Sequence, residues 1–257
     1  MAEYAGIPTP HPPLTRYYAA PADRDAFVRR VFDSTADSYD RINAACSFGS
    51  GGWYRRRALR RAGLQPGQAV LDVAVGTGLV AREAVRLLGS ARGVVGLDLS
   101  EGMLRQTGRA LPVKLICGRA EALPVADARF DFLSMGYALR HVASLPATFA
   151  EYRRVLRPGG RLLLLEIARP RGRLAYAAVR FYLGRVIPAV SALLGGGRQA
   201  RLLMQYYWDT IDACVAPATI LDALRQSGFE EVRCEVQLGI FRAYMARRPA
   251  AGGAAEG

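Results

Sequence analysis

Short apolar runs rich in branched side chains alternate, along the middle of the chain, with segments whose apolar residues recur at helical spacing. The run QAVLDV precedes LVAREAVRLL, and GVVGLDL precedes SEGMLRQTGRAL, where Ser100 is placed to cap the helix. VKLICG, FDFLSMG and GRLLLLEI continue the strands, with a helix over ASLPATFAEYRRVL and a turn at RPGG before the last of them. This alternation predicts an α/β fold with a doubly wound, mostly parallel sheet covered on both faces.

The segments outside this repeat predict helices and one hairpin. ATILDALRQSGF has helical spacing, and EEVRCEVQLGIFRAYMARR is typical of two strands joined at Gly239 in an antiparallel hairpin at the sheet edge. The first 21 residues are rich in Pro and have no period. We therefore expect a flexible arm (1–21), a single domain (22–248) that contains an N-terminal helical cap (22–63) and a helical insertion or lid (169–213), and a disordered tail (249–257).

Composition narrows the class of protein. The chain has 257 residues, 51% of them hydrophobic, enough for one sizeable core. Four scattered cysteines and only two histidines, His11 and His141, argue against a disulfide framework and a metal site. The N-terminus lacks an apolar leader, and VIPAVSALLGGG is about half the ~20 residues that span a bilayer. We expect a cytoplasmic protein with no metal.

The net charge of +13 comes almost entirely from arginine, since Lys114 is the sole lysine. Such a charge is compatible with binding to nucleic acid, with contact with an anionic membrane, or with nothing more than a genome that favours Arg. The nucleic-acid alternative lacks motif support, because FDFLSMGY is not the Asn/Asp-Pro-Pro-Tyr motif and no Pro-Cys pair supplies a nucleophile. We do not expect a nucleic-acid partner.

The stretch LDVAVGTGLVA, residues 71–81, has the features of a ligand-binding turn. Gly76 and Gly78 remove side chains where a ligand approaches the backbone, and the helix that follows offers free N–H groups. Asp98, at the end of the next strand, is placed to accept both ribose hydroxyls of an adenosine. The turn fits a dinucleotide, as G-x-G-x-x-A. With Asp72 on the preceding strand it better fits the cationic S-adenosylmethionine, while a plain structural turn stays open.

The wider series LDVAVGTG, VVGLDLSEGML, GRAEALPVADARFDF and RRVLRPGGRLLLLE resembles class I S-adenosylmethionine-dependent methyltransferases, which have a Rossmann-like seven-stranded sheet. VFDSTADSYDRIN with a following SFG, Ala74 in the turn, and GYALRHV resemble the ubiquinone/menaquinone biosynthesis C-methyltransferase family more narrowly. The resemblance covers roughly residues 28–240. It implies S-adenosylmethionine as cofactor and C-methylation of a lipophilic phenol or quinol.

The resemblance also implies which residues hold the cofactor. The glycine turn lines the methionine half, Asp98 holds the ribose, and Leu99 and Met103 pack on adenine. Arg119 stands where the family usually has Asp or Asn, and a guanidinium cannot accept from the adenine amino group. Either a backbone carbonyl accepts instead, or the affinity for the cofactor is lower. With the Tyr-Asp pair of Tyr39 and Asp40, the expected cofactor set is Tyr39, Asp72, Ala74, Gly76, Thr77, Gly78, Asp98, Leu99, Met103, Arg119, Ala120 and Gly136.

GYALRHV suggests the chemistry. A ring carbon is a poor nucleophile until a neighbouring hydroxyl ionises, and a phenol has a pKa near ~10. Arg140 matches the family's Arg and could bind the oxyanion. His141 replaces the usual Asn and is either a general base or a neutral substitute for the Asn hydrogen bonds. If both residues are extended, their side chains point to opposite faces.

Three residues are expected at the acceptor: Tyr137 as a pocket wall, Glu166 at the end of the next strand, and Tyr207 at the entrance. Residues 169–201 mix apolar side chains with Arg, so they could cover a long apolar ligand, contact the inner face of an anionic membrane, or only pack on the core. A methyltransferase for another small molecule, with O-, N- or C-methylation, and a non-catalytic cofactor-binding protein stay open.

Overall fold

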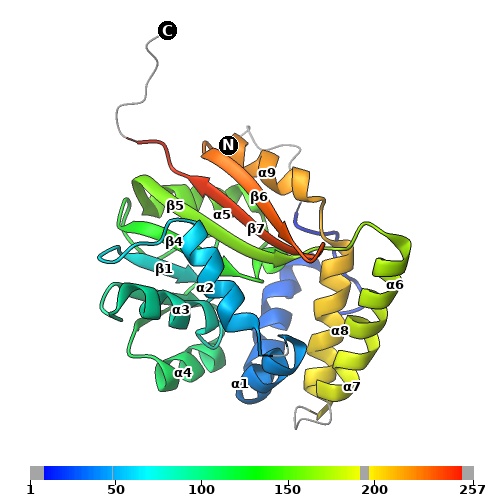
Figure 1. Ribbon diagram of the computed structural model, residues 1–257. Coiled ribbons are helices and arrows are strands. Elements are labelled where there is room, and N and C mark those ends of the chain that lie inside the picture. The colour runs from blue at the N-terminus through cyan, green and yellow to red at the C-terminus, as the bar shows by residue number, and fades with distance from the viewer. Residues whose placement is uncertain (1–8, 48, 192–196, 251–257) are drawn as a thin grey trace.

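The computed structural model describes residues 9–47, 49–191 and 197–250 (Figure 1). Its sheet has seven strands in the order β3-β2-β1-β4-β5-β7-β6. The strands are β1 (Val70–Val73), β2 (Val94–Asp98), β3 (Lys114–Cys117), β4 (Phe130–Gly136), β5 (Leu156–Ile167), β6 (Glu230–Gln237) and β7 (Phe241–Arg247). The α-helices are α1 (Arg24–Ser47), α2 (Gly51–Arg61), α3 (Leu79–Leu88), α4 (Glu101–Ala110), α5 (Leu145–Val155), α6 (Arg173–Phe181), α7 (Ile187–Ser191), α8 (Gly197–Ala213) and α9 (Pro217–Gln226), with short turns η1 (Pro21–Asp23), η2 (Leu139–His141) and η3 (Tyr182–Val186).

The predicted sheet is confirmed. β1 pairs in parallel with β2 on one side and β4 on the other, so the carboxyl ends of the central strands meet at one edge. β7 runs antiparallel to both β5 and β6, and the β6–β7 hairpin turns at Gly239, whose φ is 73°. Parallel neighbours at the centre and a reversed edge are therefore both present, as the spacing of apolar runs predicts.

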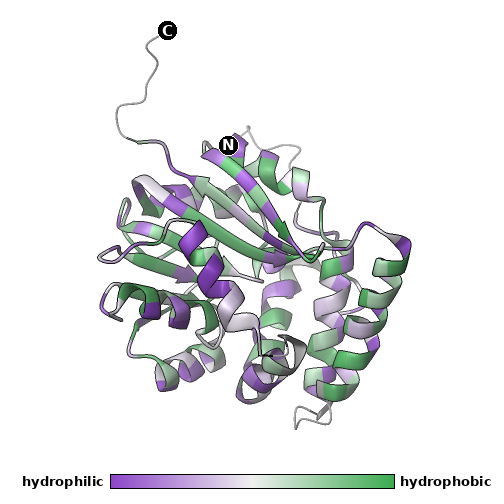
Figure 2. Cartoon of the chain, in the orientation of Figure 1, coloured by the Kyte–Doolittle hydropathy of each residue, from purple (hydrophilic) through white to green (hydrophobic). Residues whose placement is uncertain are grey.

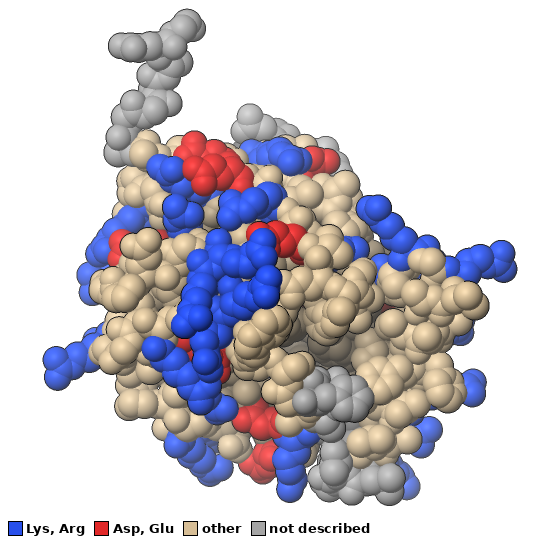
Figure 3. All heavy atoms as spheres, in the orientation of Figure 1, with Lys and Arg blue, Asp and Glu red and all other residues tan. Residues whose placement is uncertain are grey.

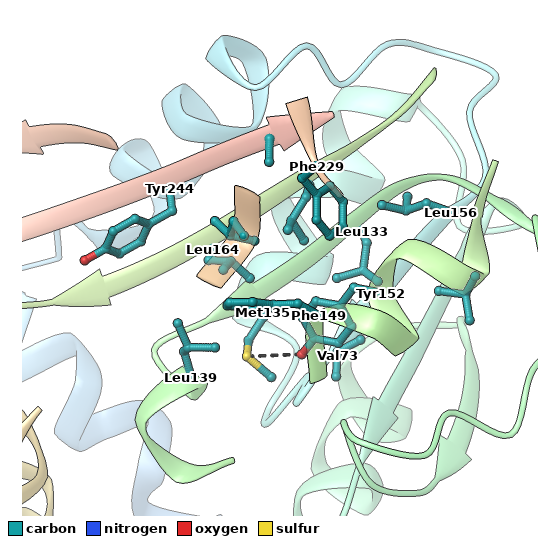
Figure 4. Close-up of a cluster of buried hydrophobic side chains, with 14 of the residues drawn as sticks. Val73, Leu133, Met135, Leu139, Phe149, Tyr152, Leu156, Leu164, Phe229 and Tyr244 are labelled. Carbon is teal, nitrogen blue, oxygen red and sulfur yellow. Dashed lines mark hydrogen bonds between the residues drawn. The ribbon is translucent and has the colours of Figure 1, made fainter. Parts of the chain in front are cut away.

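Helices cover both faces of the sheet. Leu59 of α2 and Ala81 and Ala84 of α3 are buried on one face with Phe132 of β4. On the other face, side chains of α5 and α9 pack against the strand side chains that point toward that face. Figure 4 shows this second cluster, in which the Tyr152 hydroxyl donates to Met135 Sδ at 3.4 Å. In Figure 2 the central strands are green along most of their length while α2 is largely purple, the pattern of a buried sheet under amphipathic helices.

The RPGG segment differs from its expected turn. α5 ends at Val155 and β5 begins at Leu156, so RPGG lies within the strand range. The register between β4 and β5 shifts at this point, from Phe130 opposite Leu156 to Phe132 opposite Arg161. Gly159, with a φ of 78°, lies within this irregularity, and β5 pairs with β4 on both sides of it.

The cap and the insertion pack together beyond the carboxyl ends of the strands. Phe27 and Val31 of α1 share a buried cluster with Ile187 of α7 and Leu203 and Tyr206 of α8. Figure 1 shows α1, α6, α7 and α8 grouped on this side of the sheet. Within the described part of the chain, no helix is long and apolar enough to cross a membrane.

The N-terminal segment differs from the flexible arm that the sequence predicts. Residues from 9 onward pack on the body: His11 is 4% and Tyr18 7% exposed. The Val215 N–H donates to the Pro10 carbonyl at 2.8 Å, and the Tyr17 hydroxyl donates to Asp209 at 2.5 Å. Prolines and missing periodicity indicated an unpacked segment because they exclude regular structure, but aromatic side chains anchor it without any. The first eight residues, and most of the predicted tail, lie outside the described residues.

Candidate active site

The glycine turn between β1 and α3 is tied to the end of β2. The Gly76 N–H donates to Asp98 Oδ2 and the Ser100 N–H to Asp98 Oδ1, both at 2.8 Å. Ala74, Gly76 and Gly78 have φ values of 54°, 58° and 83°, a left-handed series that makes the turn tight. Nothing lies within 4 Å of where a Cβ on Gly76 would stand, so the turn leaves open space above its backbone.

A cavity lies over this turn and the carboxyl ends of β1, β2 and β4, and we name it the glycine-turn cavity. α1 forms its opposite wall with Asp25, Val28, Phe32, Tyr39 and Asn43, positions that repeat on one face of a helix. Among the expected cofactor residues, the following line it together: Tyr39, Ala74, Gly76, Thr77, Asp98, Leu99, Met103, Arg119, Ala120 and Gly136.

Two expected cofactor residues lie behind the cavity wall. Gly78 serves packing, because a Cβ there would stand 2.9 Å from Leu111 Cδ1. Asp72 is 1% exposed and accepts from the Ser134 hydroxyl at 2.7 Å, while its Oδ2 has no hydrogen-bond partner within the described structure. Asp72 therefore does not line the glycine-turn cavity.

Burial raises the pKa values of the Asp72 and Asp98 carboxyl groups. Loss of solvent raises the pKa of Asp72 to about 7, although the Ser134 hydrogen bond opposes the shift. The same cause raises the pKa of Asp98 to about 6 against the N–H groups of Ser100 and Gly76. A cation bound nearby would favour the ionised form of each carboxyl.

Polar contacts fasten α1 over the cavity. The Thr77 hydroxyl donates to Asp40 at 2.5 Å, which joins α1 to the glycine turn. Asp33 Oδ1 accepts from the Ser100 hydroxyl at 2.5 Å and from the Gly102 N–H at 2.8 Å, so α1 also holds the start of α4. Asp40, predicted with Tyr39 as a pair, thus supports the turn from outside the cavity.

Arg119 stands at the edge of the glycine-turn cavity and closes it against α1. Its guanidinium pairs with Asp25 at 2.9 Å and lies 3.7 Å from Glu121, with its side chain about half exposed. Glu121 also lines the cavity and accepts from the Ala143 N–H. It is a carboxylate in the cavity lining that the sequence reasoning missed, because it follows the expected position, Arg119, by two residues.

The chain leaves β4 through a constrained turn that borders the glycine-turn cavity. A Cβ on Gly136 would stand 2.7 Å from Val80 Cγ2, so only glycine fits there without movement. Tyr137 has a φ of 61°, and its N–H donates to the Leu165 carbonyl at 2.6 Å. The turn η2 follows, so residues 139–141 are helical rather than extended.

His141 enters the glycine-turn cavity. Its ring stacks on Tyr206 with centroids 5.4 Å apart and meets Phe32 edge-on at 5.6 Å. Both ring nitrogens are buried, and neither has a hydrogen-bond partner among the residues described. Burial, with the nearby Arg140, His11 and Arg24 charges, holds the pKa of His141 well below its usual 6.5. The imidazole is therefore neutral near pH 7 and has a free acceptor nitrogen.

Arg140 enters a second cavity of about 430 Å³, between the end of β5, α6, α8 and α9. Its side chain is 0% exposed and donates to Glu166 at 2.5 Å and to the Thr210 hydroxyl at 3.1 Å, with the guanidinium 4.0 Å from the Tyr207 ring centroid. Glu166 also accepts from the Leu139 N–H at 2.8 Å. The predicted residues Arg140, Glu166 and Tyr207 thus meet one another, but behind η2 rather than beside the glycine turn.

Arg55 of α2 is a cavity residue that the sequence reasoning did not single out. It is 6% exposed, lines the glycine-turn cavity, and donates to Asn43 Oδ1 at 2.9 Å. Its guanidinium lies 5.7 Å from the ring centroid of Tyr137. Of the three residues that the sequence predicts beside the methyl acceptor, Tyr137 is the one that lines this cavity. Five arginines in α2 look alike in the sequence, so only packing distinguishes this one.

Two solved structures with a similar fold are named as methyltransferases. An S-adenosylmethionine-dependent methyltransferase from Aquifex aeolicus matches with a TM-score of 0.58 and 16% identity over 81% of this chain and 97% of that one. Phosphoethanolamine N-methyltransferase 2 from Haemonchus contortus, in complex with S-adenosyl-L-methionine, matches with a TM-score of 0.61 and 19% identity over 88% of this chain and 60% of that one. The fold is that of the class I methyltransferases, as predicted.

Sequence relatives define the family. The model of the ubiE/COQ5 methyltransferase family matches residues 21–246, and the chain belongs to this family. It is 35% identical to a demethylmenaquinone methyltransferase of Symbiobacterium thermophilum over 82% of this chain and 88% of that protein. It is equally identical to a ubiquinone/menaquinone biosynthesis C-methyltransferase of Syntrophotalea carbinolica over 80% of this chain and 87% of that protein. The protein is therefore a methyltransferase, and its family uses S-adenosylmethionine.

Proposed function

We propose that the protein methylates a ring carbon of a lipophilic quinol, with S-adenosylmethionine held in the glycine-turn cavity. The observation that carries the proposal is the position of His141: a neutral imidazole with no hydrogen-bond partner in the described structure shares this cavity with the glycine turn and Asp98. The names of the relatives, which describe methylation of menaquinone and ubiquinone precursors, support this class of acceptor.

The residues present fit the cofactor. Gly76 leaves space above the turn, Asp98 presents a carboxylate at the end of β2, and Leu99 and Met103 supply apolar surface beside it. When Asp72 is ionised, its negative field behind the wall suits a positively charged ligand and disfavours a pyrophosphate. Bound here, S-adenosylmethionine would supply an electrophilic methyl group.

His141 prepares the acceptor. A quinol carbon becomes strongly nucleophilic when the adjacent hydroxyl gives up its proton, and a free imidazole nitrogen can accept that proton. A low pKa makes an isolated imidazole a weak base, but a phenolate formed beside it stabilises the imidazolium. The stacking on Tyr206 and the edge contact with Phe32 fix the ring in place before an acceptor arrives.

Arg140 and Glu166 act by positioning in this account. Glu166 holds the Leu139 N–H and the Arg140 guanidinium together, and both residues anchor η2 from behind. The turn then presents His141 to the opposite side. The oxyanion role that the sequence predicts for Arg140 has little support from this geometry, since the guanidinium faces the other cavity.

We also propose that the insertion brings the protein to the membrane that dissolves the acceptor. On α6, Leu174 is 89% and Phe181 60% exposed, with exposed Arg173 and Arg180 nearby. Apolar side chains flanked by cations are the pattern of a surface that contacts anionic lipid. Residues 192–196 of the predicted contact segment 169–201 lie outside the described part of the chain, and α6 supplies the exposed surface described above.

Sedimentation with anionic vesicles tests this surface. Leu174→Asp should reduce vesicle binding, whereas Gln65→Asp, which adds the same charge beyond the opposite ends of the strands, should not. Equal binding by the wild type and both variants would remove the proposed contact.

The proposed reaction is tested by transfer of labelled methyl from S-adenosylmethionine to a demethylated lipid quinol. The reduced quinol should accept the methyl group, and the matching oxidised quinone should not, because it has no hydroxyl to ionise. If cofactor binding is intact and neither form is methylated, the acceptor is a different small molecule.

A further inference from the structure

Arg55 is a buried cation without a carboxylate partner. Among the residues described, no Asp or Glu oxygen lies within 4.0 Å of its guanidinium, and its neighbours are the Asn43 amide oxygen and the Tyr137 ring. Its Nε is buried and has no hydrogen-bond partner within the described part of the chain. Burying a charge without a counter-ion is costly, so such groups are usually completed by an anion.

The other arginines of α2 show the contrast. Arg56 pairs with Glu83 at 2.6 Å, Arg61 pairs with Glu235 at 2.8 Å, and Arg57 lies over the exposed Trp53 ring. Figure 3 shows the exposed cations as a blue band over α2. Arg55 alone of these is turned into the glycine-turn cavity.

The position of Arg55 in the cavity indicates which anion completes it. Asp98, Leu99 and Met103 lie at or just after the end of β2, whereas Arg55 lies beside Tyr137, which follows β4. In the sheet, β1 separates β2 from β4, so the two groups lie on opposite sides of the glycine turn. A ligand with its ribose at Asp98 and its amino-acid group over the turn would direct its carboxylate toward Arg55.

We propose that Arg55 binds the carboxylate of the methionine end of S-adenosylmethionine, an inference that rests on the cofactor use proposed above. The Nε–H provides a hydrogen bond as well as the charge, and Asn43 and the Tyr137 ring hold the guanidinium before the ligand binds. Asp72 lies behind the wall and interacts with Arg55 through its charge, but it forms no ion pair with the guanidinium among the residues described. An acceptor phenolate is the alternative anion, and it has His141 as its own partner.

Binding of two adenosine thioethers tests the proposal without any turnover. S-adenosylhomocysteine carries the carboxylate, whereas methylthioadenosine has the same adenosine and sulfur without an amino-acid group. Arg55→Met should weaken S-adenosylhomocysteine about 10- to 100-fold, the range of one charge-assisted hydrogen bond, and change methylthioadenosine by less than about threefold. Arg57→Met, an exposed change on the same helix, should leave both affinities unchanged.

Arg55→Lys is the control for a folding defect. It keeps the charge and should therefore retain most of the preference for S-adenosylhomocysteine. Equal weakening of both ligands by Arg55→Met and Arg55→Lys would make Arg55 a structural residue and overturn the inference. Unchanged affinity for both, with a higher KM for the acceptor alone, would assign Arg55 to the acceptor anion instead. If the wild type binds neither thioether, the cofactor proposal itself fails, which is a distinct result.

Discussion

The side chains of Arg140 and His141, neighbours in the chain, enter two different cavities. His141 faces the glycine turn, while Arg140 is held behind η2 by Glu166 and Thr210. The sequence predicts this divergence for an extended segment, but a short helical turn at residues 139–141 produces it in the structure. In the proposed mechanism, Arg140 therefore holds the turn and His141 contacts the acceptor.

Removal of one partner of the Arg140–Glu166 pair should strongly lower the stability of the protein. Arg140→Met leaves a buried carboxylate unpaired and should lower the free energy of unfolding by about 3–5 kcal/mol. Urea unfolding monitored by circular dichroism measures this. The double variant Arg140→Met/Glu166→Gln should lose less than Arg140→Met, because no lone charge remains buried. A double variant as unstable as the sum of the single changes would contradict the pairing.

Replacing His141 separates the two interpretations of that residue. His141→Asn should lower kcat by more than about 100-fold and leave S-adenosylhomocysteine affinity within about threefold, because the change removes a base without altering the glycine turn. Since its pKa lies well below 6.5, the wild-type profile of kcat/KM should show no decline from this group between pH 8 and pH 6.5. Retained activity would instead make His141 only a hydrogen-bonding residue.

Asp98 should be required for the adenosine end of the ligand. Asp98→Ala removes the acceptor of the Gly76 and Ser100 N–H groups, so both S-adenosylhomocysteine and methylthioadenosine should lose about 100-fold or more in affinity. Isothermal titration calorimetry provides the comparison. The parallel loss distinguishes Asp98 from Arg55, and unchanged affinity would move the cofactor elsewhere.

Asp72 should make stability depend on pH. Its folded pKa is raised from 3.8 to about 7, so the folded state keeps a proton that the unfolded state has released, and stability falls as pH rises from about 4 to about 7. Asp72→Asn keeps an oxygen for Ser134 and removes the charge. It should therefore be more stable than the wild type at pH 8, by at most about 4 kcal/mol at about 1.4 kcal/mol per pKa unit. Urea unfolding at pH 5 and pH 8 measures the difference, and an equal effect at both pH values would disprove the shift.

A double-mutant cycle tests the close approach of Val80 to Gly136. Gly136→Ala places a methyl group against Val80 Cγ2 and should cost about 1–3 kcal/mol of stability. In a Val80→Ala background the clashing atom is absent, so the same change should cost less. Thermal unfolding of the four proteins gives the coupling, and identical costs in both backgrounds would mean that the turn adjusts without strain.

Much of the fold follows from local sequence. The alternation of apolar runs and helical segments predicts the strand series, Ser100 caps α4 by accepting from the Met103 N–H at 3.1 Å, and Gly239 marks the edge hairpin. These features depend on residues close together in the chain, where spacing is informative.

The site was less predictable because side-chain direction depends on packing. The sequence identifies the glycine turn but cannot tell that Asp72 faces away from the cavity or that Arg140 turns toward Glu166. Arg55 is indistinguishable from its neighbours in α2 until α2 is packed beside the glycine turn. The packed arm escaped prediction for a similar reason, since the partners of Tyr17 come from α1 and α8.

The most direct test of the central claim is the position of the transferred methyl group in the product. After turnover with a demethylated lipid quinol and labelled S-adenosylmethionine, nuclear magnetic resonance of the purified product distinguishes a methyl on carbon from one on oxygen. The account predicts a methyl group on the ring carbon next to a hydroxyl. A methyl ether would contradict it, because His141 would then have activated the oxygen as the nucleophile itself.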